Sequence, residues 1–193
     1  MTAAWAASIA AQALLALTLY RAGQRDWWTL YLALEAARSL LLFLMAQPVH
    51  SHNFWWAWVI TQLATTYPGV RMIQQASGAG PSQFLGIGLA AGMFSWAIAL
   101  THPDWPVYRR AGLMLHQCLA FGGFGIMCAA AADGIKRPAI LAYFTIESLE
   151  VLAEQIARTR VWVEPVGIVY LVTLTALFYA LLLHERSMNY ARR

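Results

Sequence analysis

The stretch Tyr143-Phe-Thr-Ile-Glu-Ser-Leu-Glu-Val-Leu-Ala-Glu154 places three carboxylates, at Glu147, Glu150 and Glu154, in an otherwise apolar run. Their spacing of three and four residues puts them on one face of a helix. An ionisable group inside a bilayer is costly, so it normally faces a protein interior, a water-filled path or a partner. The stretch therefore predicts a transmembrane helix whose acidic face is turned away from lipid.

The whole chain has the composition of a membrane protein. Of its 193 residues, 60% are hydrophobic and 11% are charged, whereas soluble domains carry about 25% charged residues. A spanning helix needs about 20 largely apolar residues. Such segments lie at about 3–20, 27–46, 54–74, 83–101, 107–132, 138–157 and 162–184. We predict an all-α seven-transmembrane helix bundle, a single domain over 1–193 of a polytopic integral membrane protein in the cell membrane, with the lipid bilayer as its surroundings.

Basic residues predict the orientation of this bundle. Short connectors make sequential helices antiparallel neighbours, and cytoplasmic loops carry the excess of Lys and Arg. One side holds eight such residues, namely Arg21, Arg25, Arg71, Lys136, Arg137, Arg186, Arg192 and Arg193. The other side holds four, namely Arg109, Arg110, Arg158 and Arg160. We therefore expect the N-terminus outside and the C-terminus in the cytoplasm.

Polar stripes run along four of the predicted helices. At 100° per residue, the polar side chains of each of these segments gather on one face. We expect the four faces to line a shared polar interior. Besides the three acids of 138–157, the stripes contain Tyr31, Glu35, Arg38, Gln62, Thr65, Thr66, Tyr143, Tyr170 and Thr173.

The interior charges are expected to pair. Glu35 and Arg38 lie near the middle of their segment, at the depth expected for Glu147 and Glu150. Arg38 can therefore reach either of those carboxylates, and an isolated buried charge is heavily penalised. One Arg cannot neutralise all the acids, so the others are expected to be protonated unless water enters.

His116, about nine residues into the segment 107–132, is expected to be hydrogen-bonded inside the bundle. Alternatively it joins a relay with the carboxylates, because imidazole titrates near neutral pH.

Small residues predict where helices approach closely. Gly88 and Gly92 form a GxxxG pair, which typically packs two membrane helices together. Gly122, Gly123 and Gly125 interrupt the next segment and serve either packing or the admission of a ligand. Pro68-Gly69 is expected to kink its helix and free carbonyl groups.

Several functions are excluded or disfavoured by what the chain lacks. There is no nucleophile elbow, Walker loop, Rossmann glycine pattern or HExxH motif. The only lysine, Lys136, lies in a connector, which excludes a retinal Schiff base. We expect no cofactor, no bound metal, no nucleic-acid partner and no enzymatic activity, although an acid pair acting on a lipid substrate stays open.

Two hypotheses of function remain. The first is a small integral subunit or accessory protein of a larger membrane assembly, with other protein subunits or further copies of itself as partners, in which the polar stripes serve packing. The second is a proton- or cation-linked transporter, channel or small-ligand receptor that uses Glu35, Arg38, Glu147, Glu150 and Glu154, with His116 as a further candidate.

The orientation can be tested with a cysteine introduced at the C-terminus. An impermeant thiol reagent added outside intact cells should leave this cysteine unmodified, because the basic side of the bundle is expected in the cytoplasm. Modification from outside would reverse the assignment.

Overall fold

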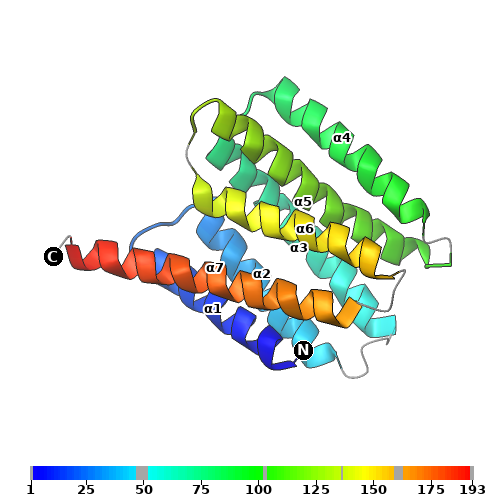
Figure 1. The fold of residues 1–193 in the computed structure, drawn as a ribbon, viewed down its shortest axis with the longest axis horizontal. Coiled ribbons are helices and arrows are strands. Elements are labelled where there is room, and N and C mark those ends of the chain that lie inside the picture. The colour runs from blue at the N-terminus through cyan, green and yellow to red at the C-terminus, as the bar shows by residue number, and fades with distance from the viewer. Residues whose placement is uncertain (1, 47–51, 102–103, 136, 159–162, 192–193) are drawn as a thin grey trace.

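The computed structural model describes residues 2–46, 52–101, 104–135, 137–158 and 163–191. Their secondary structure consists of seven helices (Figure 1). These are α1 (Thr2–Arg21), α2 (Trp27–Met45), α3 (His52–Ser77), α4 (Pro81–Leu100), α5 (Val107–Ala132), α6 (Pro138–Arg158) and α7 (Val163–Ala191). The all-helical prediction is confirmed. Of the residues counted for orientation, Lys136, Arg160, Arg192 and Arg193 and the side chains of Arg158 and Arg186 lie outside the described part.

Local sequence signals account for several helix ends. Asp26 caps α2 by accepting hydrogen bonds from the Thr29 backbone N–H and hydroxyl, both at 2.9 Å. Pro81 occupies the first turn of α4, where no backbone donor is needed. Gly134 follows α5 at φ 85°, and Ile135 N–H donates to the Ala130 carbonyl at 2.9 Å. This left-handed glycine with a reversing hydrogen bond ends the helix in the manner of a Schellman motif.

Six of the helices form a closed ring. Contacts join α1 to α2, α2 to α3, α3 to α5, α5 to α6, α6 to α7, and α7 back to α1. We call these helices the six-helix ring. The remaining helix, α4, packs against α5 outside this ring and lies at one edge of the molecule (Figure 1). Successive helices alternate in direction, so the ring has two ends and an interior along its axis.

Five helices are long and apolar enough to cross a membrane. Within the described residues these are α1, α2, α4, α5 and the part of α7 from Pro165 to Glu185. The protein is therefore a membrane protein whose apolar helices contact lipid. The helices α3 and α6 are not among these five; both carry more polar side chains, of which Gln62 and Glu147 are buried.

Glycines of α5 set the close approaches around that helix. A Cβ built on Gly112 would lie 2.5 Å from the Trp58 ring of α3, and one on Gly123 would lie 2.6 Å from the Phe144 ring of α6. Packing, rather than admission of a ligand, therefore explains the lack of a side chain at Gly123.

The GxxxG pair of α4 has a different environment. A Cβ on Gly88 or Gly92 would meet nothing within 4 Å. The approach of α4 to α5 instead uses Ala91, whose Cβ lies 3.6 Å from the position of a Cβ on Gly122. Within the described chain, Gly88 and Gly92 thus leave space that no neighbouring side chain fills. On α3, Gly69 makes the close contact, because a Cβ there would lie 2.9 Å from Leu119.

The two kinds of glycine can be distinguished by mutation. Gly123→Ala should lower stability by about 1–3 kcal/mol, because the added methyl overlaps a buried aromatic ring. The matched variant Gly88→Ala should be neutral or stabilising by up to about 1 kcal/mol, since its methyl enters open space on a helix. Thermal unfolding of both variants in one detergent provides the comparison. Equal destabilisation by the two substitutions would contradict the assignment.

Candidate functional site

A cavity inside the six-helix ring brings two carboxylates together. It has a volume of about 220 Å³ and lies among α1, α2, α6 and α7. Glu35 and Glu147 both line it, although Glu35 is only 6% exposed and Glu147 only 5%. Its other polar lining residues are Ser8, Gln12, Ser39, Tyr143 and Tyr170. We call this space the acid cavity.

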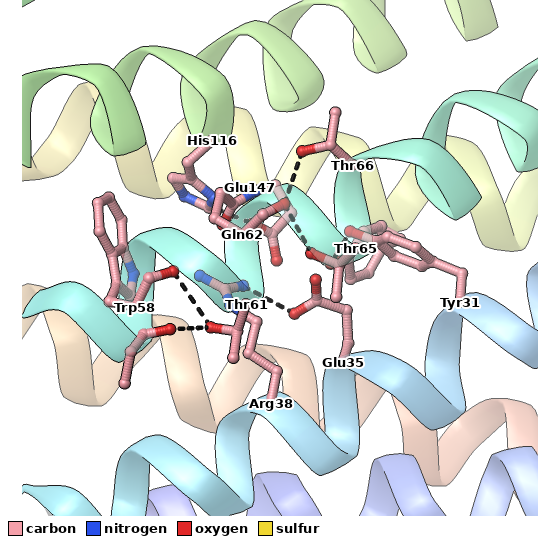
Figure 2. A network of polar contacts seen from close by, with 12 residues as sticks. Tyr31, Glu35, Arg38, Trp58, Thr61, Gln62, Thr65, Thr66, His116 and Glu147 are labelled. Atoms are coloured by element: carbon pink, nitrogen blue, oxygen red, sulfur yellow. Dashed lines mark hydrogen bonds and ion pairs between the residues drawn. The ribbon is translucent and has the colours of Figure 1, made fainter. Parts of the chain in front are cut away.

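Glu35 is paired within its own helix. One guanidinium nitrogen of Arg38, Nη1, donates to Glu35 Oε2 at 2.9 Å, and both side chains are largely buried. Residues three apart on a helix are neighbours, so this pair needs no particular helix packing. Arg38 had been expected to pair with an acid of α6, and the structure corrects this for Glu147. Figure 2 shows the guanidinium turned toward Glu35.

Glu147 is held by groups from two other helices. The hydroxyl of Tyr170 on α7 donates to Glu147 Oε1 at 2.7 Å. On the other side, His116 Nε2 of α5 lies 3.9 Å from Glu147 Oε2. His116 was expected to be hydrogen-bonded inside the bundle; it lies beside Glu147, at a distance too long for a hydrogen bond (Figure 2). Among the described side chains, Arg38 pairs with Glu35 and no guanidinium pairs with Glu147.

An aromatic layer lies one helical turn from the carboxylates. The hydroxyls of Tyr31 and Tyr143 are 3.2 Å apart and share a hydrogen bond. Their rings meet edge to face at 5.9 Å, and Trp28 meets Tyr143 at 5.8 Å. Phe178, fully buried, lies against the other side of Tyr143 with ring centroids 6.2 Å apart. This layer fills the ring between α2, α6 and α7.

A larger hollow lies on the other side of this layer. It has a volume of about 590 Å³ and is lined by residues of α1, α2, α3, α6 and α7. Charged and polar groups at its mouth are Gln24, Asp26, Gln75, Arg137, His184 and Glu185. We call this hollow the vestibule.

The vestibule and the acid cavity follow one another along the ring axis. On α2, Trp28 lines the vestibule and Glu35 lines the cavity. On α6, Ile140 and Glu147 stand in the same relation, again seven residues apart. Seven residues of helix correspond to about 10 Å. The Trp28–Tyr143 contact is thus the partition between the two spaces.

Buried amides on α3 and α5 extend the polar interior. Gln62 and Gln117 are 1% and 0% exposed. Among the described residues, Gln62 Oε1 and both amide atoms of Gln117 have no hydrogen-bond partner. Glu35 Oε1 and Arg38 Nε share this property. Buried polar atoms normally have a partner in the protein or in water, so this group of atoms fits a hydrated interior.

The threonines predicted to line the interior differ in their surroundings. Thr65 is buried and Thr66 half-buried, and both hydroxyls donate to the Gln62 carbonyl of their own helix. Thr173 was expected in the interior but is exposed, so this prediction is corrected. Its hydroxyl donates to the Val169 carbonyl at 2.8 Å, which satisfies it on the outer face of α7.

Two of the acids on α6 lie apart from the acid cavity. Glu150 and Glu154 are half-buried, and neither is among the residues that line it. They follow Glu147 by about one and two helical turns. The buried residues on this part of α6 are Tyr143, Glu147 and Ser148. Ser148 donates to the Ala120 carbonyl of α5 at 3.2 Å.

Sequence reasoning missed the contribution of α1. Ser8 and Gln12 are buried and line the acid cavity. They are the only hydrophilic residues between Ala3 and Leu17 and are spaced four apart, so they share a helix face. That spacing was a readable signal. Ser39, beside Arg38 on α2, was missed as well.

Comparisons with protein-family models, with curated proteins and with solved structures find no match for this chain. The residues and geometry of the cavity are therefore the basis for a functional proposal.

The Tyr170–Glu147 bond can be measured by a double-mutant cycle. Tyr170→Phe should reduce stability by about 1 kcal/mol, the usual size of such a bond, and the loss should largely disappear in a Glu147→Gln background. Tyr179→Phe on the same helix is the control, because that side chain is 57% exposed. Strictly additive effects in denaturant titrations of the four proteins would mean that the two groups do not interact.

Proposed function

We propose that this protein is a proton- or monovalent-cation-linked membrane transporter or channel, and that Glu147 in the acid cavity is its exchangeable site. The observation that carries the proposal is that the buried Glu35 and Glu147 line one cavity, with the Arg38 guanidinium bound to Glu35. With both acids ionised and Arg38 charged, the cluster has one negative charge in excess. A proton or a monovalent cation is the ligand that removes this excess.

The lining of the acid cavity supports the binding of a cation. Hydroxyl and amide oxygens of Ser8, Gln12 and Ser39 face the same space as the two carboxylates. Oxygen atoms are the ligands that hard cations prefer. A volume of about 220 Å³ corresponds to roughly seven water molecules at about 30 Å³ each. The cavity is therefore large enough for a partly hydrated ion.

The vestibule supports the proposal that the ion enters from one end of the ring. It is open at the end formed by the α1–α2 and α5–α6 connectors and leads toward the layer of Trp28, Tyr31 and Tyr143. Asp26 and Glu185 at its mouth provide acidic groups beside the basic Arg137 and His184. Movement of the aromatic layer would connect the vestibule with the acid cavity.

We further propose that α3 and α6 also cross the membrane, which gives the seven-span bundle expected from the sequence. Both helices belong to the closed ring, and each runs antiparallel to the helices before and after it in the chain. Gln62 of α3 and Glu147 of α6 are buried, whereas Ile60, Leu63 and Leu149 are exposed. This division matches a helix with one face toward a polar interior and one face toward lipid.

One observation favours the alternative of a subunit in a larger assembly. The helix α4 lies outside the ring, and its Leu85, Leu89 and Met93 are 60% or more exposed. The central acids of the polar stripes on α2 and α6, Glu35 and Glu147, are in contrast buried. This contrast makes the transport proposal the stronger of the two.

Flux through reconstituted liposomes tests the proposal. Liposomes with the protein should pass protons, sodium or potassium faster than protein-free liposomes. Glu147→Gln should reduce this flux about tenfold or more, because a charged contact of roughly 1.5–3 kcal/mol is removed from the site. Glu147→Asp should retain part of it.

Asp133→Asn is the matched control, because Asp133 is exposed at the end of α5 and lines neither space. Its flux should equal that of the unmodified protein. Flux unchanged in Glu147→Gln would overturn the role of Glu147. No flux with any of the three ions, together with a partner chain that co-purifies in fixed ratio, would favour the assembly alternative.

A further inference from the structure

A long groove on the outer surface of the ring lies between α1 and α2. Its volume is about 860 Å³, and its walls come from both helices together with Arg25, Asp26 and Gln75. The buried Ala16 and Ala36 form its floor. Exposed side chains such as Leu17 and Leu40 form its rims. The groove exists because alanines of two adjacent helices face each other where neighbouring positions carry leucines.

The groove has the length of one lipid leaflet. On α1 it extends from Ile9 to Tyr20, which is twelve residues, and on α2 from Trp27 to Leu40, which is fourteen residues. Helices of these lengths measure about 18–21 Å, and half of the hydrocarbon core of a bilayer is about 15 Å. Both helices are among those long and apolar enough to cross the membrane. The apolar part of the groove therefore matches a single acyl chain in depth.

One end of the groove is basic. The Arg25 guanidinium lies 5.1 Å from the centroid of the Tyr20 ring, and the Arg71 guanidinium lies 5.6 Å from that of Trp27. Both rings belong to the groove. Asp26, the one acid there, already accepts two hydrogen bonds from Thr29 as the cap of α2.

These charges suit a phosphate. Guanidinium groups bind phosphate oxygens in a forked geometry, and basic residues at a membrane surface favour anionic lipids. A zwitterionic headgroup gains less from two arginines than an anionic one. The charge at the end of the groove thus selects among lipids, while the alanine floor accepts any acyl chain.

We propose that the groove between α1 and α2 binds one anionic phospholipid, with an acyl chain along the alanine floor and the phosphate beside Arg25. The site is separate from the acid cavity, because the two share no lining residue. Its occupancy does not depend on the transport proposal. A lipid there would also cover the outer side of the contact between α1 and α2. The inner sides of these two helices carry Gln12 and Glu35, which line the acid cavity.

Native mass spectrometry of the full chain, extracted in detergent and supplied with equal amounts of phosphatidylglycerol and phosphatidylcholine, tests this site. The unmodified protein should retain one molecule of phosphatidylglycerol in preference to phosphatidylcholine. Arg25→Gln should reduce that preference about fivefold, the factor expected for one basic residue at the surface. The double variant Ala33→Leu, Ala37→Leu should lose the retained lipid, because both positions are exposed in the groove wall.

Ala90→Leu on the exposed face of α4 is the matched control and should retain the lipid. Thermal unfolding identifies any variant that does not fold. If the double leucine variant does not fold, the lipid preference of Arg25→Gln tests the proposal. Equal retention of the two lipids by the unmodified protein, or unchanged retention by the groove-filled variant, would overturn the proposal. A dimer that the leucines dissociate would overturn it too, because a second copy would then occupy the groove.

Discussion

Ionised groups cannot remain among lipid tails without partners, and the architecture of this protein follows from that constraint. Glu35, Arg38 and Glu147 each need neighbours other than acyl chains. The ring of six helices supplies them, because its interior receives one polar face from each of several helices. The less apolar character of α3 and α6 is the consequence, since these helices use part of their surface for the interior. The outer helix α4 contains no charged residue that needs a partner, and it is largely exposed.

The sequence predicted the interior faces of α2 and α6 because their polar residues recur with a helical period. Tyr31 and Glu35, and likewise Tyr143 and Glu147, are four apart, and the structure buries all four. The partner of each acid was harder to predict. Arg38 binds Glu35 on its own helix, an arrangement that local spacing always permits, whereas a bond to α6 depends on the rotation and tilt of two helices. Thr173 shows the same limit, because a step of three residues from Tyr170 rotates it by about 60° and out of the interior.

Glycines show a second limit of reasoning from motifs. The pair Gly88 and Gly92 has the spacing of a packing motif, yet a Cβ on either glycine would meet nothing within 4 Å in the described chain. The tightest approaches are instead at Gly112 and Gly123, eleven residues apart on α5. Their importance comes from the bulky partners Trp58 and Phe144, which belong to other helices. A glycine pattern states where an approach is possible, and only the neighbouring side chain decides where one occurs.

The tyrosine pair between the two spaces has a chemical consequence for the ring. A layer made only of leucine and phenylalanine would separate the vestibule from the acid cavity by apolar groups. Tyr31 and Tyr143 instead place two hydroxyls within 3.2 Å of each other in the middle of that layer, one turn from Glu35 and Glu147. A tyrosine hydroxyl can both donate and accept a hydrogen bond. The pair can therefore exchange its mutual bond for bonds to water or to a carboxylate at little cost in unsatisfied groups, which an apolar layer cannot do. Such a layer offers polar groups between the vestibule and the acid cavity, where an apolar layer would offer none.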